Sequence, residues 1–253
     1  TDKREIPMEL PLWGGFYAGS DGYYLVEGQN NTAEDNSAEV IRVIRYDTNW
    51  NRSGAASITS NPDLFGGEVR YPFDYGCVEM TETNGTLYIV TGHEGYVDES
   101  VGQGHQGFLM IAVDQASMTG KIVSCDLWHS FAQSIKSQSS YLYVLVQSEG
   151  SRCTQLSRYD STTLDKKTIE LLPYGGSRTS VWALNCYASV DGVAVSADSV
   201  LCIGTTIDQS QYDNVTSDTP HNIYLTITPV SDFSKEATSV KYLTNYTGNG
   251  KSF

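Results

Sequence analysis

A turn followed by an apolar strand recurs four times along this chain, and this repeat constrains the fold more than any other feature. The four copies are Asp21–Val26, Asn84–Val90, Ser139–Val144 and Ala197–Ile203. When Tyr24, Tyr88, Tyr143 and Cys202 are aligned, the copies are 64, 55 and 59 residues apart. Self-similarity at such a period is typical of propellers and other repeat architectures.

A second strand follows each of these copies and ends at an aspartate or a proline. The four examples are Val43–Asp47, Met110–Asp114, Leu156–Asp160 and Leu225–Pro229. A polar turn and a last strand come next, as in Gly120–Cys125 and Lys167–Leu172, and weaker strands such as Cys77–Glu82 and Gly192–Ser196 precede the later copies. Aspartate suits these turns because its side chain bonds the local backbone. Each unit is therefore predicted to hold about four antiparallel strands.

Helical periodicity is nearly absent, and short runs rich in Val, Ile, Tyr and Thr alternate with turn residues. The candidate strands are Gly22–Glu27, Val40–Tyr46, Gly85–Thr91, Gly107–Val113, Tyr141–Gln147, Gln155–Tyr159, Val200–Thr205 and Asn222–Thr228. The chain is thus expected to be all-β.

The repeat favours a β-propeller of about four four-stranded antiparallel blades. A single unit cannot bury both faces of its sheet, whereas units stacked around an axis do so. A β-sandwich, the main competitor, would have about seven strands without a fixed internal register. The approximate units are 13–67, 68–130, 131–178 and 179–253. Either the chain is part of a larger propeller, or Trp13–Ala18 completes the last blade and closes the ring.

Composition narrows the setting and the partners. The chain has 253 residues and a formal net charge of −14, which repels phosphate backbones, so nucleic acid is not expected as a partner. No apolar run approaches the roughly 18–20 residues that a membrane span needs, so membrane insertion is not expected. Charged residues are only 18% of the chain, and neutral polar residues replace them. Such a surface is typical of secreted proteins and of sugar-binding proteins. Because four blades make a small propeller and larger rings are more usual, other domains are expected in a longer parent chain.

The five cysteines form no CxxC pair, which argues against a zinc or redox motif. Their odd number leaves at least one unpaired within the chain. Cys202 lies in an apolar run and is interpreted as a small buried hydrophobic residue. Five free, mostly buried thiols are favoured, and intrachain disulfides are the alternative.

Several short segments carry a resemblance to a known group of repeat proteins. They are Asn84–Gly85, Thr91–Glu94, Gly104–Gln106, Val113–Asp114, Ile44–Asp47 and His129–Phe131. These segments resemble the repeat units of uncharacterised secreted and cell-surface β-propeller proteins of gut bacteria. The resemblance is diffuse and spans most of the chain. It implies a bacterial setting at the cell surface or outside the cell, and it transfers no catalytic residue.

The densest group of chemically active side chains lies around one predicted hairpin loop. His93 and Glu94 precede the loop, Asp98 and Glu99 lie in it, and His105 ends it. Two imidazoles and a carboxylate would suit a transition metal, although the spacing matches no zinc motif. The favoured interpretation is that both histidines bond loop backbone and hold the loop shut. His93, Glu94 and His105 remain candidate ligand-binding residues.

Acidic residues suggest two further sites. Glu94 with Asp98, or Asp208 with Asp213, could form the carboxylate pair of a glycoside hydrolase, although most carboxylates of an acidic chain are simply solvated. The oxygen-rich segments 30–36 and 208–214 could bind calcium, but neither has the spacing of an EF-hand. A solvated loop is the favoured interpretation, so no cofactor is expected and calcium is the alternative.

Aromatic residues are the better guide to a ligand. A flat ring beside amides and carboxylates can stack on a sugar, and large aromatics also anchor protein interfaces. Trp50, in the polar turn after Asp47, is expected to be the most exposed tryptophan, and Trp128 is the second candidate. The competing interpretation is packing between blades.

Three functions follow from these features. The first is a non-catalytic extracellular binding or scaffold module whose ligand is a glycan or a protein. The second is an enzyme that cleaves polysaccharide, a glycoside hydrolase or lyase, with carboxylate or histidine chemistry in the axial pocket. The third is a structural repeat that only spaces other domains. The absence of a recognisable catalytic motif favours the first.

Overall fold

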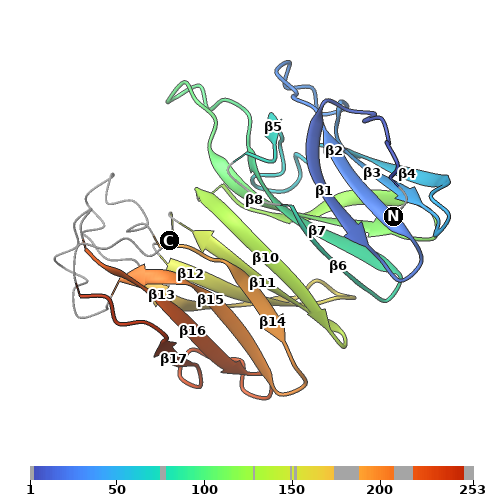
Figure 1. Ribbon diagram of the computed structural model, residues 1–253. Coiled ribbons are helices and arrows are strands. Elements are labelled where there is room, and N and C mark those ends of the chain that lie inside the picture. Colours follow the sequence, from blue (N-terminus) through green and yellow to red (C-terminus); the bar gives the residue numbers. More distant parts are fainter. Residues whose placement is uncertain are drawn as a thin grey trace.

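The computed structural model describes residues 3–74, 78–127, 129–148, 150, 153–173, 188–207 and 219–247. Every regular element within these ranges is a β-strand. The strands form four antiparallel sheets that follow one another in chain order (Figure 1). No helix in these ranges could cross a membrane.

Sheets 1, 3 and 4 are four-stranded meanders in which each strand pairs with the next. Their strands are, for sheet 1, β1 (Leu12–Ala18), β2 (Tyr23–Gly28), β3 (Glu39–Tyr46) and β4 (Arg52–Thr59); for sheet 3, β10 (Ser130–Gln138), β11 (Tyr141–Ser148), β12 (Cys153–Asp160) and β13 (Lys166–Pro173); and for sheet 4, β14 (Gly192–Val195), β15 (Ser199–Ile207), β16 (His221–Pro229) and β17 (Ser239–Tyr242).

Sheet 2 has the same antiparallel order, but two short strands, β5 (Tyr71–Pro72) and β6 (Glu79–Thr83), take the place of its first strand. Its other strands are β7 (Thr86–Glu94), β8 (Gln106–Asp114) and β9 (Thr119–Cys125). Both β5 and β6 pair with β7, through its two ends.

Each pair of successive sheets encloses its own hydrophobic core. One core holds Val43 of sheet 1 against Ile89 of sheet 2, and the next holds Val90 of sheet 2 against Val144 of sheet 3. The third core joins Leu145 of sheet 3 to Tyr224 of sheet 4. Sheets that cover each other in series are blades, so the fold is a β-propeller of four four-stranded antiparallel blades. The expected repeat fold is confirmed.

All eight strands expected from sequence are present, as β2, β3, β7, β8, β11, β12, β15 and β16. They are the two central strands of each sheet. The alternative in which Trp13–Ala18 completes the last blade is wrong, because β1 pairs with β2 in sheet 1. Sheets 1 and 4 lie at opposite ends of the series (Figure 1).

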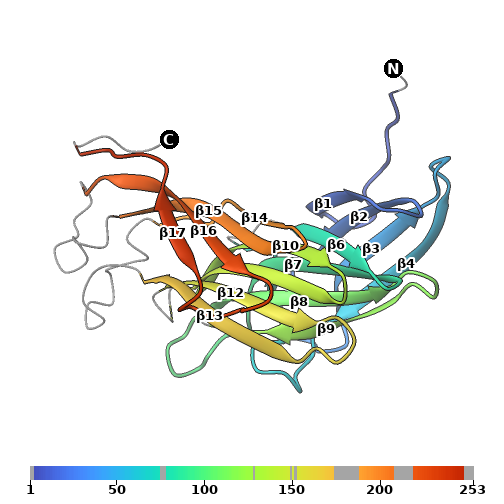
Figure 2. The same ribbon diagram turned by 90° about the horizontal axis from the view of Figure 1, so that it is seen from below.

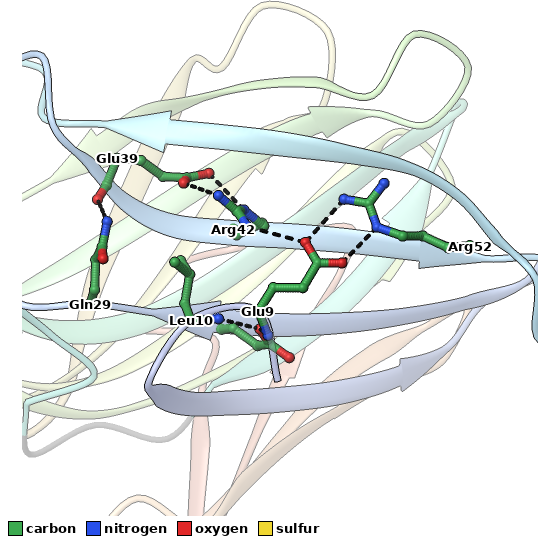
Figure 3. Close-up of polar contacts among 7 residues, drawn as sticks. Glu9, Leu10, Gln29, Glu39, Arg42 and Arg52 are labelled. Carbon is green, nitrogen blue, oxygen red and sulfur yellow. Dashed lines mark hydrogen bonds and ion pairs between the residues drawn. The ribbon is translucent and has the colours of Figure 1, made fainter. Parts of the chain in front are cut away.

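Polar contacts fix the residues before β1 against the outer face of sheet 1 (Figure 3). The Glu9 carboxylate lies between two guanidinium groups, 3.1 Å from Arg42 Nη1 and 2.6 Å from Arg52 Nε. The buried Glu27 carboxylate accepts hydrogen bonds from the backbone N–H groups of Glu9 and Leu10, at 2.7 and 2.9 Å. Hydrogen bonds to an ionised carboxylate are stronger than those between neutral groups, so Glu27 holds the backbone of Glu9 and Leu10 in place.

Three described cysteines, Cys125, Cys153 and Cys202, are free thiols. Cys202 is fully buried, as expected. Burial raises the pKa of Cys125 and that of Cys202 to about 12, so both stay protonated and unreactive at neutral pH. Cys77 and Cys186 lie outside the described residues.

Candidate functional site

The two edges of the propeller carry connections of different length. One edge, the turn edge, carries mostly tight hairpins: 19–22, 47–51, 84–85, 115–118, 139–140, 161–165 and 196–198. The other, the loop edge, carries longer segments in sheets 1 and 2: 29–38, 60–70 and 95–105. In Figure 1 these long segments lie toward the top, and the hairpins lie toward the bottom and the right. Binding residues concentrate on loops that a rigid scaffold positions, so the loop edge is where a site is expected.

The structure brings together three of the five residues chosen from sequence. His93 and Glu94 end β7 and His105 immediately precedes β8, so all three lie at the loop edge of sheet 2. Trp50 lies in the hairpin between β3 and β4, at the turn edge. Trp128 lies outside the described residues.

His93 is a buried structural residue. Its side chain shares a face of β7 with Ile89, which packs toward sheet 1. Burial lowers the pKa of His93 to about 4, although the nearby backbones of Gly66 and Gly107 oppose this shift. Neither ring nitrogen reaches hydrogen-bonding geometry with the described residues. A fully buried imidazole cannot meet a ligand from solution.

Glu94 points to the opposite face of the same sheet and is half-buried. Its backbone carbonyl accepts a hydrogen bond of 2.9 Å from the Arg70 N–H, and its Oε1 lies 3.9 Å from Arg70 Nη1. Burial and the neighbouring Asp74 carboxylate raise the pKa of Glu94, and Arg70 lowers it. Glu94 is therefore a carboxylate between one acid and one guanidinium.

Asp74, like Arg70 and Gln106, is a residue of this cluster that sequence reasoning missed. It lies between β5 and β6 of sheet 2. Burial raises the pKa of Asp74, partly offset by a hydrogen bond with the Gln106 side chain. Its Oδ2 is buried without a partner among the described residues. Gln106 is the direct cross-strand neighbour of Glu94, so Asp74, Glu94 and Gln106 form one polar group.

His105 closes the loop that links β7 to β8. Its carbonyl accepts a hydrogen bond from the Gly95 N–H at 2.9 Å. Its Nδ1 lies 3.3 Å from His129 Nε2, and its Nε2 lies 3.9 Å from Asp98 Oδ2. The Asp98 carboxylate accepts hydrogen bonds from the Ser100 hydroxyl and N–H, which lower its pKa. The imidazole of His105 therefore contacts His129 and Asp98, and its backbone carbonyl, bonded to Gly95, closes the base of the loop 95–105.

The described residues contain no group of three metal-ligating side chains. In the segment 30–36, Asn31 and Asp35 bond the local backbone: Asn31 Nδ2 donates to the Asp35 carbonyl at 3.0 Å, and Asn31 Oδ1 accepts from the Asp35 N–H at 3.1 Å. Asp208 and Asp213 lie outside the described residues, as does the segment 208–214.

Trp50 packs against other aromatic rings. Its ring is nearly parallel to that of Tyr23, with centroids 4.2 Å apart, and a third ring, Phe16, lies 6.2 Å away. Trp50 is half-buried, whereas Trp13 is 54% exposed, so the expectation that Trp50 is the most exposed tryptophan is wrong. The cluster of Phe16, Tyr23 and Trp50 lies on sheet 1, away from the polar group of sheet 2.

No family model and no curated protein sequence matches this chain. Among solved structures it is similar to a mutant of the Synechocystis apocarotenoid oxygenase, with 9% identity, a TM-score of 0.47, and coverage of 92% of this chain and 50% of that one. It is similar to GH43B of the Bacteroides ovatus xyloglucan PUL, with 12% identity, a TM-score of 0.44, and coverage of 87% and 39%.

A third similar structure is an alpha-L-arabinofuranosidase from Lactobacillus brevis, with 10% identity, a TM-score of 0.47, and coverage of 89% and 70%. The chain spans half or less of the first two of these proteins. Identities and scores this low carry no information about activity. The assignment of the propeller therefore rests on the strand order and the three cores described above.

Proposed function

We propose that this chain is a non-catalytic module that binds a neutral glycan at the loop edge of sheet 2. The observation that carries the proposal is the polar group of Asp74, Glu94 and Gln106 beside Arg70. Carboxylates accept hydrogen bonds from sugar hydroxyls, while the amide and the guanidinium donate them. The group therefore offers both kinds of partner that a vicinal diol needs.

Charge favours a neutral ligand over an anionic one. The chain carries a formal charge of −14, and two of the three polar groups in the cluster are acids. A polyanion would be repelled both by the whole molecule and by the site. We further propose that the module is secreted or displayed at the cell surface as part of a longer chain, which suits its low fraction of charged residues.

The proposal is tested by screening the chain on a glycan array and measuring the affinity of any hit by calorimetry. Glu94→Gln and Asp74→Asn should each weaken binding about tenfold, because each removes a charged acceptor. Glu236→Gln is the matched control, since it removes the same charge from an exposed residue at the turn edge of sheet 4. An array without any hit, or a protein as the ligand recovered instead, would refute the proposal.

A polysaccharide-cleaving enzyme is the second candidate, and one observation favours it. Burial raises the pKa of Glu94 at the end of β7, whereas hydrogen bonds from Ser100 lower the pKa of Asp98 in the loop that follows. Glycoside hydrolysis uses such a pair, a protonated acid and an ionised partner. The test is the release of reducing ends from a panel of neutral polysaccharides. The enzyme hypothesis requires activity that Glu94→Gln abolishes, and no release by the wild type would exclude it for that panel.

A further inference from the structure

A groove lies outside the polar group, where β9 of sheet 2 approaches β12 and β13 of sheet 3. The groove has a volume of about 560 Å³ and is lined by residues from the end of β9, from β12 and β13, and from the segment 60–70. Figure 2 shows β9 on the same side of the molecule as β12 and β13. This volume lies within the range of roughly 300–1,000 Å³ that small-molecule sites occupy.

An exposed aromatic ring stands at the groove. Phe65 lines it and is 71% exposed, the highest value among the large hydrophobic residues described. The backbone beside it is held in place: the Cys125 thiol donates to the Phe65 carbonyl at 3.2 Å. Gly66 has a φ of +82°, and a Cβ there would lie 2.8 Å from the backbone of Asp126. The ring is therefore presented by a fixed backbone.

Leu64, Val123 and Cys125 also line the groove, and the remaining lining residues are polar. Most of the hydroxyl and carboxylate groups among them already have partners. Ser124 Oγ lies 3.2 Å from the Tyr159 hydroxyl, and Thr168 Oγ1 lies 2.8 Å from Ser157 Oγ. The Asp126 carboxylate accepts a hydrogen bond of 3.2 Å from a backbone N–H of β8. These contacts fix the wall of the groove.

Two lining groups have no hydrogen bond or ion pair to the described residues. They are the side-chain amide of Gln155 and the ammonium of Lys166, whose Nζ lies 5.5 Å from the centre of the Tyr159 ring. An amide that both donates and accepts, with a cation that donates, is suited to pairs of hydroxyl groups. Asp126 is the only carboxylate among the described residues that line the groove, and the acid pair of a glycosidase needs two.

We propose that this groove binds one ring of a neutral sugar. The apolar C–H face of the ring would lie on Phe65, and its hydroxyls would meet Gln155 and Lys166. A sugar ring has one face of C–H groups and a rim of hydroxyls, and this combination matches one free aromatic ring beside free polar groups. The site is separate from the polar group of sheet 2 and does not depend on it.

The test uses the whole chain and a panel of neutral methyl glycosides, together with tetrasaccharides built from the same sugars. Saturation-transfer NMR detects binding, and calorimetry measures the affinity. Phe65→Ala should weaken binding about tenfold, as loss of an aromatic anchor does. Gln155→Ala should weaken it several-fold. Phe16→Ala is the matched control, because it removes an exposed ring from sheet 1 and should leave the affinity unchanged. Thermal unfolding of each variant confirms that it is folded.

Three results would overturn the proposal. They are no binding of any saccharide in the panel, an affinity that Phe65→Ala and Phe16→Ala reduce equally, or binding that Glu94→Gln removes and Phe65→Ala leaves intact. The last result would assign the sugar to the loop edge of sheet 2, so the groove and the proposed function can fail separately. Binding that Phe65→Ala removes and Glu94→Gln leaves intact supports the groove alone.

Discussion

His93 and Glu94 are consecutive residues with opposite environments. Successive side chains of a strand point to opposite faces of the sheet. His93 therefore lies in the core between sheets 1 and 2, whereas Glu94 lies on the face of sheet 2 that is directed toward sheet 3. A sequence motif that contains both therefore cannot bring both to one ligand. The partners of Glu94 come instead from other segments, namely Arg70, Asp74 and Gln106.

His93 should make the stability of the protein depend on pH. Its pKa is about 4 in the folded state and near the ordinary 6.5 when unfolded, so its contribution is complete above pH 6.5 and is lost as the pH falls toward 4. The difference corresponds to roughly 3 kcal/mol. Urea unfolding of wild type and His93→Gln between pH 7 and 4 measures it, and the variant should show a flatter dependence.

The raised pKa values of Asp74 and Glu94 act in the opposite direction. A carboxyl group whose folded pKa lies above its unfolded value stabilises the fold as the pH falls, so neither group can produce the loss expected from His93. Equal slopes for wild type and His93→Gln would show that the imidazole is not the group responsible.

At the scale of strands, central and outer positions differ in how clearly sequence predicts them. The central strands of sheets 1 to 3 are buried on both faces and are nearly continuous apolar runs, as in Leu87–Val90 and Leu142–Val146. Outer strands bury less: β4 and β13 alternate with exposed residues, and β17 is exposed throughout. The apolar runs therefore predicted the centre of each sheet best.

Phe73, which lies between β5 and β6, packs against two glycines of sheet 1. Phe73 has a φ of +65°, and its ring packs over β1 and β2 at Gly14 and Gly28. A Cβ at Gly28 would lie 2.7 Å from the ring, closer than a real contact allows. The two glycines provide the space that the ring occupies.

Gly28→Ala should therefore destabilise the protein by about 1–3 kcal/mol, since overpacking a filled site forces side chains or backbone to move. Gly192→Ala is the matched control, because no heavy atom lies within 4 Å of the Cβ it would add. Chemical denaturation of both variants gives the comparison. Equal stabilities would mean that Phe73 moves away at little cost.

At the scale of the molecule, the hydrophobic cores of the described residues join successive sheets. Each of the three cores between sheets joins two successive sheets, and sheets 1 and 4 lie at opposite ends (Figure 1). Stability in such a series is approximately a sum of unit and neighbour contributions. A substitution that weakens one core should therefore destabilise the two sheets that share this core more than the other two sheets.

Leu145→Ala removes a buried side chain from the core between sheets 3 and 4, and Leu109→Ala does the same between sheets 1 and 2. Each should cost about 2–5 kcal/mol. Amide hydrogen exchange should rise most in sheets 3 and 4 for the first variant and in sheets 1 and 2 for the second. A uniform rise across the molecule in both variants would show that the sheets open as one unit.

The sequence by itself determined the repeat, the central strands and the all-β class, because these depend on local alternation and turn chemistry that recur along the chain. The loop-edge position of His93, Glu94 and His105 also followed from their places at strand ends. Only the tertiary structure decided that His93 is buried, that Asp74 joins Glu94, that Trp50 packs on Tyr23, and that Phe65 stands over a groove. Those outcomes depend on how segments far apart in the sequence pack together. A local sequence pattern does not predict them, because it carries no information about which face of one sheet contacts which loop of another.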